Sequence, residues 1–562
     1  MKNADKAAQY VEDVLSGKEP ACRWVRLAVE RHVADMKRVG DHAWRYVYEP
    51  ARGERPCKVI EQLPHTKGKW AAKKEKIVLQ NWQAFILCCI FGWVDRTTGK
   101  RRFREADIFV PRKNGKSALS AGTGIFMLAF DGEYGPEIYC NATTEKQAWE
   151  VFEPARYMVS NTPELKVAKR LSVNAQTITA PEVAGKFLPV IGKPGDGSSP
   201  SMAIIDEYHE HTTPAALDTM QTGMGAREQP LLWVITTAGD NTAGPCYSKQ
   251  TILQDILSGA LKDDTVFGII YTVDPEDDWT DPAVLRKANP NMDVSVDGEF
   301  LRSQQQKAIT NPRDQARFKT KHLNIWVNSR DAFFNGESWR KCPAAPKLEE
   351  LLGRRCRVAI DLASKTDIAA MEILFDISDL AGEGHYARYG KIYLPSSTID
   401  DPKNAHYRQW REAGYLAETD GNIIDFRQVE DDILALCEDF QVADVSYDPF
   451  QATYIATRLM ERRAPMTEYK MTVATMSDPM KTLDSWILAG RLHHNCGDDH
   501  PLTWQIGNVT ARRDHKDNVY PNKESEEKKI DSPVALIMCV GRETTDLTPS
   551  GSVYENRGLL LL

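Results

Sequence analysis

Residues 109–121, FVPRKNGKSALSA, contain the Gly-Lys-Ser of a phosphate-binding loop. In such a loop, the backbone N–H groups that open a helix bind phosphate. Lys116 is expected to reach the β and γ phosphates of a nucleotide, and Ser117 to ligate Mg²⁺. The usual pattern has a further glycine five residues before Gly115, where this chain has Val110. Taken alone, the stretch therefore predicts either a nucleotide site or a basic surface turn.

Two acids downstream favour the nucleotide site. The sequence AIIDE runs from an apolar strand into Asp206 and Glu207. Asp206 is predicted to hold Mg²⁺ opposite the loop, and Glu207 to polarise the water that attacks the γ-phosphate. Arg112 stands where a standard loop has a neutral residue. We predict that Arg112 contacts the γ-phosphate in cis and acts in hydrolysis.

Further polar residues complete the predicted nucleotide site. Gln83, beside Trp82, is predicted to read adenine through its amide, although most lone glutamines have no such role. Thr236 and Thr237 end the strand LLWVITTAG and either sense the γ-phosphate or form a simple turn. His209 is interpreted as a loop histidine. The predicted nucleotide-binding set is Gln83, Arg112, Asn114, Gly115, Lys116, Ser117, Ala118, Asp206 and Thr237.

A second set of acids lies in the carboxyl-terminal half. Asp361 and Asp448 each follow an apolar strand, and Asp531 precedes the last helix. Convergent carboxylates hold two divalent ions about 4 Å apart, of which one activates water and the other stabilises the leaving oxygen. Oxygen-only ligands suit Mg²⁺ or Mn²⁺. Asp367 is a possible further ligand, and the alternative is that all are solvated turn residues.

The elements that must position these residues form two α/β patterns. Strands alternate with helices between residues 105 and 239, which predicts a mostly parallel sheet with its ligand site at the carboxyl ends of the strands. Three strands in 357–395, a fourth at 442–449 and a final helix follow the order of a ribonuclease H-like fold. Residues 503–523 suggest a β-hairpin with a basic tip, and 511–529 a contact to the DNA backbone that nearby acids weaken.

Size and composition exclude several classes of protein. The chain has 562 residues and a net charge of −8, so global charge does not predict a nucleic-acid partner. Its 11 cysteines contain no C-x-x-C pair, which indicates a reducing compartment without a structural zinc site. The longest apolar run, residues 84–93, is too short to span a bilayer. We therefore expect a cytosolic protein with no membrane partner.

The combined motifs VPRKNGKS, AIIDE, TTAG, VAIDLA, YDP and DSPVAL resemble one family, the large terminase subunit of tailed bacteriophages. The resemblance implies an amino-terminal ATPase of the additional-strand, ring-forming type and a carboxyl-terminal ribonuclease H-like nuclease. It assigns ATP and Mg²⁺ to the first site and two Mg²⁺ or Mn²⁺ ions to the second. By position, Glu207 is the hydrolysis base, and Asp361, Asp448 and Asp531 are the nuclease metal ligands.

The resemblance also implies function and partners. ATP hydrolysis drives double-stranded DNA into a procapsid through the portal protein, and the nuclease cuts concatemeric DNA. A small terminase subunit and a homo-oligomeric ring, expected to be a pentamer, are implied in the cytoplasm of the infected bacterial host. A trans-acting arginine finger is also expected, with Arg156 and Arg227 as candidates.

We expect four segments along the chain. Residues 1–60 are a helical segment, 61–335 the P-loop ATPase domain with a linker region from about 260, 345–545 the nuclease domain, and 546–562 a tail. One alternative is a helicase-like DNA-repair ATPase fused to a nuclease, which needs a second motor core. Another is a DNA-binding assembly protein with inactive sites.

Overall fold

The computed structural model describes residues 1–191, 197–242, 244–327, 332–362, 367–401, 404–514, 516–525 and 527–547. The chain divides into two compact units, Met1–Val327 and Asn328–Leu562. Of the predicted tail, residues 546–562, those from 548 onward lie outside the described residues, as does His515 of the predicted basic hairpin.

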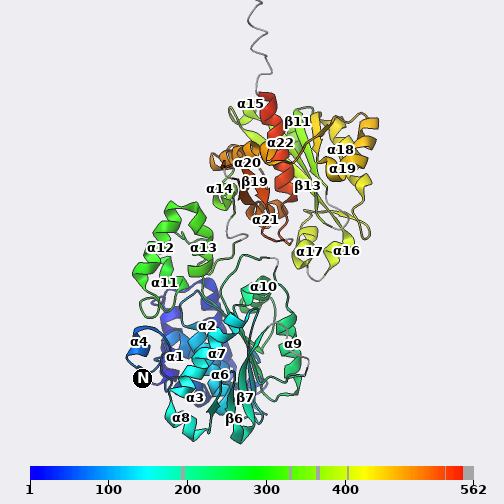
Figure 1. Ribbon diagram of the computed structural model, residues 1–562. Helices are drawn as coiled ribbons and strands as arrows, with labels where there is room; N and C mark the ends of the chain where they lie inside the picture. Colours follow the sequence, from blue (N-terminus) through cyan, green and yellow to red (C-terminus); the bar gives the residue numbers. More distant parts are fainter. Residues whose placement is uncertain are drawn as a thin grey trace, which may run out of the picture. The chain divides into compact units, whose positions relative to one another are not determined.

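The first unit is built on one twisted sheet (Figure 1). Its strands are β3 (Glu105–Phe109), β4 (Glu137–Ala142), β5 (Ser172–Val173), β6 (Ile178–Ala180), β7 (Gly185–Ile191), β8 (Met202–Asp206), β9 (Leu231–Thr236) and β10 (Val266–Ile270). They lie in the order β10, β3, β9, β8, β4, β7, β6, β5. Neighbours are parallel from β10 to β7, and only the β7–β6 and β6–β5 pairs are antiparallel. The predicted mostly parallel sheet is confirmed.

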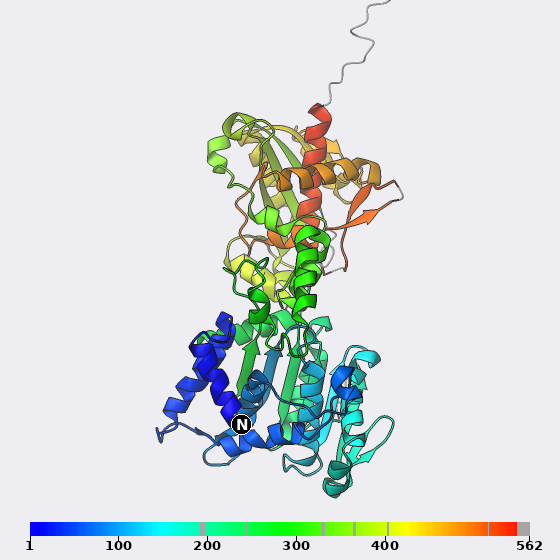
Figure 2. The same ribbon diagram turned by 90° about the vertical axis from the view of Figure 1, so that its left-hand side faces the viewer.

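Helices cover this sheet, and an amino-terminal group packs beside it (Figure 2). The helices are α1 (Asn3–Leu15), α2 (Arg23–Arg38), α3 (Pro50–Ile60), α4 (Gly68–Ala72), α5 (Asn81–Gly92), α6 (Lys116–Ala129), α7 (Glu145–Ser160), α8 (Pro163–Ala168), α9 (Ala215–Gly223) and α10 (Pro245–Ser258). α5 is apolar on all sides and packs against α1 and α3, as expected of a helix inside a core. A short ribbon of β1 (Tyr46–Tyr48) and β2 (Trp93–Asp95) joins this group.

Small residues let α6 lie close to its neighbours. A Cβ added at Gly122 would lie 2.8 Å from Ile60 Cγ1, and one at Gly124 would lie 2.8 Å from the Phe187 ring. Real side chains do not tolerate such contacts without movement of a neighbour. The small-residue sequence of α6 therefore fixes the helix whose first turn contains Lys116 and Ser117.

The linker region is predicted to begin at about residue 260. One segment after that point, residues 266–270, is instead a strand of the main sheet of this unit. Val266–Ile270 form β10, which pairs in parallel with β3 at the sheet edge. The sequence VFGII is a short buried strand, which polar flanking loops conceal. Helices follow it in the same unit: α11 (Val284–Ala288), α12 (Gly298–Thr310) and α13 (Pro312–His322).

The second unit is a mixed sheet flanked by helices. Its strands are β11 (Arg355–Asp361), β12 (Ala369–Asp376), β13 (Tyr386–Pro395), β14 (Ala417–Thr419), β15 (Gln441–Tyr447), β16 (Met466–Glu468) and β17 (Leu492–His493). β11, β12 and β13, the three strands predicted in 357–395, form an antiparallel meander, and β15 pairs in parallel with β11. The sheet order is β14, β13, β12, β11, β15, β16, with β17 beside β13.

The last helix, α22 (Asp531–Leu547), packs against β11 and β12. The other helices are α14 (Gly336–Arg340), α15 (Ser378–Ala381), α16 (Ser396–Asp400), α17 (Ala405–Glu412), α18 (Phe426–Asp439), α19 (Pro449–Glu461), α20 (Val473–Leu488) and α21 (Pro501–Asn508). The predicted hairpin is shorter than 503–523, since α21 occupies its beginning. It consists of β18 (Thr510–Arg513) and β19 (Val519–Asn522).

Among the described residues, no helix combines the length and the apolar character needed to cross a membrane.

Candidate nucleotide and nuclease sites

The Gly-Lys-Ser turn joins the end of β3 to the start of α6 at the carboxyl edge of the sheet. Gly115 has a φ of 88° and caps α6, a left-handed conformation that favours glycine. Val110, the residue in place of the usual glycine, is buried, and its N–H donates to Thr236 O at 3.0 Å. Val110 therefore continues the strand pairing with β9, and the turn itself begins after it.

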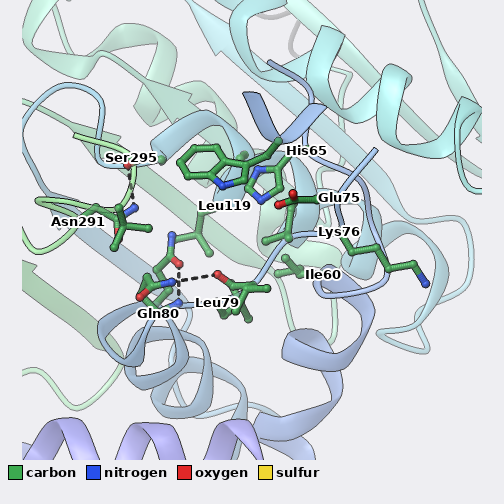
Figure 3. A pocket seen from close by; sticks show the side chains of 16 residues that line it. Ile60, His65, Glu75, Lys76, Leu79, Gln80, Leu119, Asn291 and Ser295 are labelled. Atoms are coloured by element: carbon green, nitrogen blue, oxygen red, sulfur yellow. Dashed lines mark hydrogen bonds between the residues drawn. The ribbon is translucent and has the colours of Figure 1, made fainter. Parts of the chain in front are cut away.

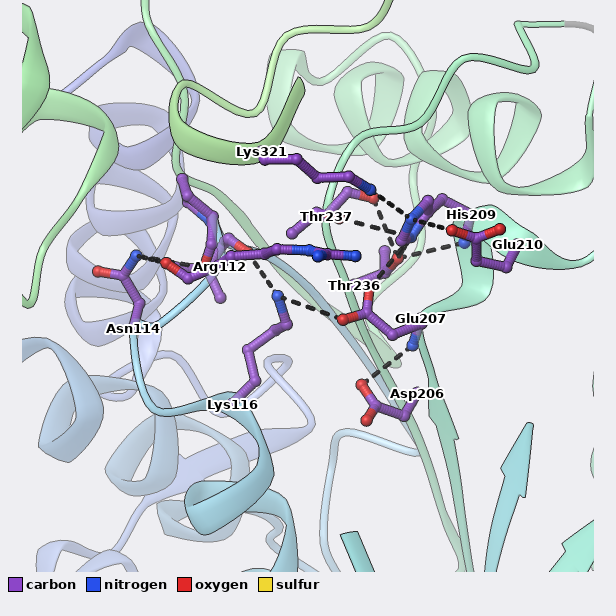
Figure 4. A network of polar contacts seen from close by, with 12 residues as sticks. Arg112, Asn114, Lys116, Asp206, Glu207, His209, Glu210, Thr236, Thr237 and Lys321 are labelled. Carbon is purple, nitrogen blue, oxygen red and sulfur yellow. Dashed lines mark hydrogen bonds and ion pairs between the residues drawn. The ribbon is translucent and has the colours of Figure 1, made fainter. Parts of the chain in front are cut away.

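Lys116 and Glu207 face each other across the sheet edge (Figure 4). Lys116 Nζ donates to Val110 O at 3.1 Å and lies 4.0 Å from Glu207 Oε1. Burial lowers the pKa of Lys116, and the charges of Glu207 and Asp206 oppose that effect. The two predicted motifs are thus brought together, because β9 alone separates β3 from β8.

The two acids of AIIDE have different environments. Burial and the charge of Glu207 raise the pKa of Asp206 to about 7, and Asp206 Oδ1 accepts from Glu207 N at 3.0 Å. Burial opposes ionisation of Glu207, but the cations around it, chiefly Lys116, lower its pKa overall. Glu207 also has a φ of 48°, an uncommon left-handed backbone for a non-glycine residue. Such outliers cluster at functional sites.

Asn114 and Arg112, two further residues of the predicted site, differ in burial. The Asn114 side chain is fully buried and bonded within the protein: Nδ2 donates to Asn289 Oδ1 at 3.0 Å, and Oδ1 accepts from Asn291 N at 3.0 Å. Its side chain therefore fixes the loop to the segment before α12. Arg112 is exposed, its backbone N–H donates to Lys321 O at 3.1 Å, and its side chain contributes to the lowered pKa of Glu207.

A pocket adjoins the loop (Figure 3). The side chains of His65 and Trp70 stack at 5.0 Å between ring centroids on one part of its wall. Gln83 lines another part, but its Oε1 already accepts from Gln80 N at 2.9 Å. The lining residues are Ile60, His65, Trp70, Glu75, Lys76, Ile77, Val78, Leu79, Gln80, Gln83, Gly115, Ala118, Leu119, Asn291, Val294 and Ser295. The predicted residues Gln83, Gly115 and Ala118 thus share one pocket.

Sequence reasoning missed His209 and Lys321 as members of the site. His209 is buried, and its Nδ1 lies 3.0 Å from Thr236 Oγ1 and 3.2 Å from Glu207 Oε2. Lys321 Nζ, from the end of α13, lies 3.2 Å from His209 Nε2. The position of His209 directly after the two acids was a signal, whereas nothing local marks Lys321. Thr237 is buried, with its Oγ1 3.4 Å from His209 Nδ1.

The three predicted nuclease acids lie at one region of the second unit. Ile360 of β11 pairs with Tyr447, the last residue of the parallel strand β15. Asp361 and Asp448 are the residues that directly follow this pair. Asp531 opens α22, which packs on β11. Burial raises the pKa of Asp361 well above its ordinary value, and the charges of Asp531 and Asp448 add to the effect. Asp531 and Asp448 are therefore close enough to Asp361 to oppose its ionisation.

The same acids have some, but not all, of the features of a cation site. Burial and Asp367 raise the pKa of Asp531 to about 6, and Asp531 Oδ2 is buried without a hydrogen-bond partner. Asp367 is paired with Lys529 at 2.7 Å. Within the part of the chain that the structure describes, no three His, Cys, Asp or Glu side chains lie close enough to hold one ion as they stand. The acids affect one another without forming a closed ligand set.

Some of the remaining predicted cations have ion-pair or hydrogen-bond partners. Arg512, Arg513 and Lys516 of the β18–β19 hairpin are all exposed, and Arg513 pairs with Asp517 at 2.6 Å. Arg156 pairs with Glu153 at 2.9 Å, and Arg227 Nε donates to Ser199 O at 2.7 Å. Both arginine-finger candidates thus have partners within their own chain.

Comparison with known proteins gives consistent matches along the chain. Residues 81–254 match the family described as the terminase large subunit, ATPase domain, and residues 260–546 match its endonuclease domain. The chain is 46% identical to Protein YmfN of Escherichia coli (strain K12) over 360 residues, which are 62% of this chain and 78% of that protein. It is 25% identical to the large terminase subunit of Enterobacteria phage HK97 over 464 residues, which are 80% of this chain and 89% of that protein.

The crystal structure of the HK97 large terminase aligns with a TM-score of 0.44 and 24% identity, over 87% of this chain and 99% of that chain. The ATPase match ends at residue 254 and the endonuclease match begins at residue 260. A helicase-like chain would need a second motor core after the first. The residues that follow the ATPase match belong instead to the endonuclease match. The chain belongs to the terminase large-subunit family, with an ATPase domain followed by an endonuclease domain.

Proposed function

We propose that this chain is the motor and nuclease of a phage DNA-packaging machine. ATP hydrolysis in the first unit would drive double-stranded DNA into a procapsid, and the second unit would cut concatemeric DNA. The observation that carries this proposal is the meeting of Lys116 and Glu207, 4.0 Å apart, above a sheet edge that also carries Asp206. A lysine, a magnesium-holding acid and a water-polarising acid are the parts that phosphoryl transfer to water requires.

In the nucleotide site, the pocket beside the loop would receive the base and the start of α6 the phosphates. Ser117 and Asp206 offer a hydroxyl and a carboxylate, which are the hard oxygen donors that Mg²⁺ prefers. When bound, Mg²⁺ would neutralise charge on the β and γ phosphates. Glu207, with its lowered pKa, is ionised at neutral pH and can accept a proton from the attacking water. Arg112 would approach the γ-phosphate from the loop.

In the nuclease site, Asp361, Asp448 and Asp531 would hold Mg²⁺ or Mn²⁺. A divalent cation would offset the burial and the repulsion that together raise the pKa of Asp361, and would give Asp531 Oδ2 a partner. The ions would supply an activated water and a charge against the leaving oxygen. The exposed hairpin residues Arg512 and Lys516 would contact the DNA backbone.

The proposed partners follow from the family. They are DNA, a portal protein, a small terminase subunit and other copies of this chain in a ring, expected to be a pentamer. We place this assembly in the cytoplasm of the infected bacterial host.

A paired assay on the full chain tests the proposal. ATPase turnover and cleavage of plasmid DNA are measured for wild type, Glu207→Ala and Asp361→Ala, with EDTA added and then replaced by Mg²⁺ or Mn²⁺. Glu207→Ala should lose ATPase and keep cleavage, and Asp361→Ala the reverse. Chelation should abolish cleavage. Retention of both activities in both variants would show that these site assignments are wrong, and ATP-dependent protection of DNA inside procapsids tests packaging itself.

A further inference from the structure

A buried polar network links Glu207 to helix α13 through one histidine (Figure 4). The His209 side chain is fully enclosed, and its two ring nitrogens face different elements. Nδ1 faces Glu207 Oε2 at 3.2 Å and Thr236 Oγ1, at the end of β9, at 3.0 Å. Nε2 faces Lys321 Nζ at 3.2 Å and Glu210 Oε1 at 3.2 Å.

The chemistry of these partners assigns the ring hydrogen. An ammonium group only donates hydrogen bonds, so a nitrogen that bonds to Lys321 must be an acceptor. The imidazole is then neutral, with its hydrogen on Nδ1. Burial lowers the pKa of His209, which is consistent with a neutral ring. In this tautomer Nδ1–H faces three oxygens: Thr236 Oγ1 at 3.0 Å, Glu207 Oε2 at 3.2 Å and Thr237 Oγ1 at 3.4 Å.

Thr236 and Glu207 are both placed to receive that hydrogen. The Thr236 hydroxyl donates to Thr237 O at 3.0 Å, so its oxygen is left as an acceptor. Glu207 Oε2 is buried and has no hydrogen-bond partner, because the 3.2 Å contact with Nδ1 is not aligned as a hydrogen bond. A small rotation of the ring or of the carboxylate would align it. The orphaned oxygen of the proposed hydrolysis base thus has a near donor in Nδ1–H.

Glu210 favours the opposite tautomer. Its carboxylate only accepts hydrogen bonds, so a hydrogen bond from Nε2 to Glu210 Oε1 would require the hydrogen on Nε2. If Lys321 withdrew, the hydrogen on Nε2 would be favoured, and the Nδ1 lone pair would face the Glu207 carboxylate. The Lys321 backbone is itself held to the phosphate loop, because its carbonyl accepts from Arg112 N at 3.1 Å. The position of α13 relative to the loop therefore controls the side of the ring that carries the hydrogen.

We propose that His209 is a positioning residue for Glu207, and that Lys321 sets its tautomer. With Lys321 in place, Nδ1–H holds the Glu207 carboxylate in the orientation needed to accept a proton from water. The network couples the state of helix α13 and of the β9 end to hydrolysis. This inference rests on the proposed role of Glu207.

Three substitutions in the full chain test it through kcat and KM for ATP. Asn places its amide near the position of Nδ1, whereas Gln places it near Nε2, so His209→Asn can keep the donor toward Glu207 and His209→Gln cannot. We expect His209→Gln to lower kcat by about 10-fold to 100-fold, as misplacement of a catalytic group does, with KM unchanged. His209→Asn should keep most of kcat. Lys321→Met should lower kcat about tenfold.

The combination of variants separates the tautomer from simple charge. His209→Asn no longer has the nitrogen that Lys321 contacts, so Lys321→Met should cost nothing further in that background, a non-additive pair. Additive losses would mean that Lys321 acts directly on Glu207 or on the nucleotide, and would overturn the tautomer role. Equal losses in His209→Asn and His209→Gln, or a raised KM, would indicate a merely structural histidine.

Matched controls guard against general effects. His211→Gln removes a second buried histidine of the same loop, and Arg317→Met removes an exposed cation of α13; both should keep wild-type kcat. Thermal unfolding of each variant reports on folding. Glu207→Gln separates the two hypotheses. If it abolishes turnover while His209→Gln does not, only the inference fails, whereas if it leaves turnover intact, the proposed function of Glu207 fails.

Discussion

At the scale of single residues, the nucleotide site depends on charge placed close to the sheet edge. Arg112 replaces a neutral loop residue, and its charge helps to lower the pKa of Glu207. Its backbone is tied to Lys321, while its side chain is exposed on the side of Glu207 (Figure 4). The exposed side chain is therefore available for a γ-phosphate.

Arg112→Ala should bind ATP nearly as well as wild type but hydrolyse it more slowly. The loss in kcat should approach about 100-fold, the usual effect of removing one group that stabilises transition-state charge. Binding is measured by calorimetry with a non-hydrolysable analogue, and turnover by phosphate release. Lys113→Asn is the matched control, because it removes the neighbouring exposed cation and should keep turnover. Unchanged turnover in Arg112→Ala would make it a surface cation.

A buried histidine of the second unit should make that unit sensitive to acid. His494 stacks on Trp339 at 3.9 Å between ring centroids, donates from Nε2 to Trp339 O at 3.0 Å, and accepts at Nδ1 from Cys496 N at 3.2 Å. Burial lowers its pKa from 6.5 to about 4. Below pH 6.5 His494 binds a proton in the unfolded chain but not in the folded unit. The free energy of unfolding therefore falls as the pH drops toward 4.

The decrease in the free energy of unfolding that is due to His494 should reach about 3 kcal/mol below pH 4. Denaturant unfolding at pH 7.5, 6 and 5 measures the part of this loss that develops by pH 5. His494→Asn keeps an acceptor for Cys496 N and should show a smaller pH dependence than wild type. His42→Asn, at an exposed histidine, should not change the dependence. An identical dependence in wild type and His494→Asn would contradict the assignment.

At the scale of elements, helix α6 must pack closely to place the phosphate loop. Gly122→Ala would bring a Cβ to 2.8 Å from Ile60 Cγ1. Alanine in place of glycine favours a helix by about 1 kcal/mol, but overpacking costs about 1–3 kcal/mol, so we expect net destabilisation. The thermal unfolding temperature and the affinity for ATP should both decrease. Ile60→Ala should relieve the clash, so that the double variant is less impaired than the two single losses predict.

The β18–β19 hairpin is the second element with a testable role. Arg512 and Lys516 are exposed, whereas Arg513 is paired with Asp517. The double variant Arg512→Ala, Lys516→Ala should weaken DNA binding and lower the slope of log affinity against log salt by about 2. Fluorescence anisotropy with a DNA duplex at several salt concentrations measures this slope. Arg513→Ala should change it less, and equal slopes in wild type and the double variant would exclude a backbone contact.

At the scale of the whole molecule, the chain consists of two compact units with separate cores. Residues 1–327 and 332–547, expressed separately, should therefore each fold. The first should hydrolyse ATP, and the second should cut DNA with Mg²⁺ or Mn²⁺. Circular dichroism and the two activity assays decide. A second piece that is unfolded alone, but folded in the full chain, would contradict this division.

The sequence by itself determined the family, the two α/β patterns and the ends of the strands that carry acids. Periodicity and capping are local, so β3, β8, β9, β11 and β15 could be located from neighbouring residues. The buried strand β10 could not, because a short apolar run between polar loops does not reveal its sheet partner.

Only the tertiary structure decided which side chains meet. Asn114 appeared to be a nucleotide contact, yet its side chain bonds to Asn289 and Asn291, from a segment far along the chain. His209 appeared to be an ordinary loop residue until α13 placed Lys321 beside its ring. The physical reason is that local sequence sets where an element begins and ends, whereas the protonation and orientation of a buried polar group depend on partners that folding brings from distant segments.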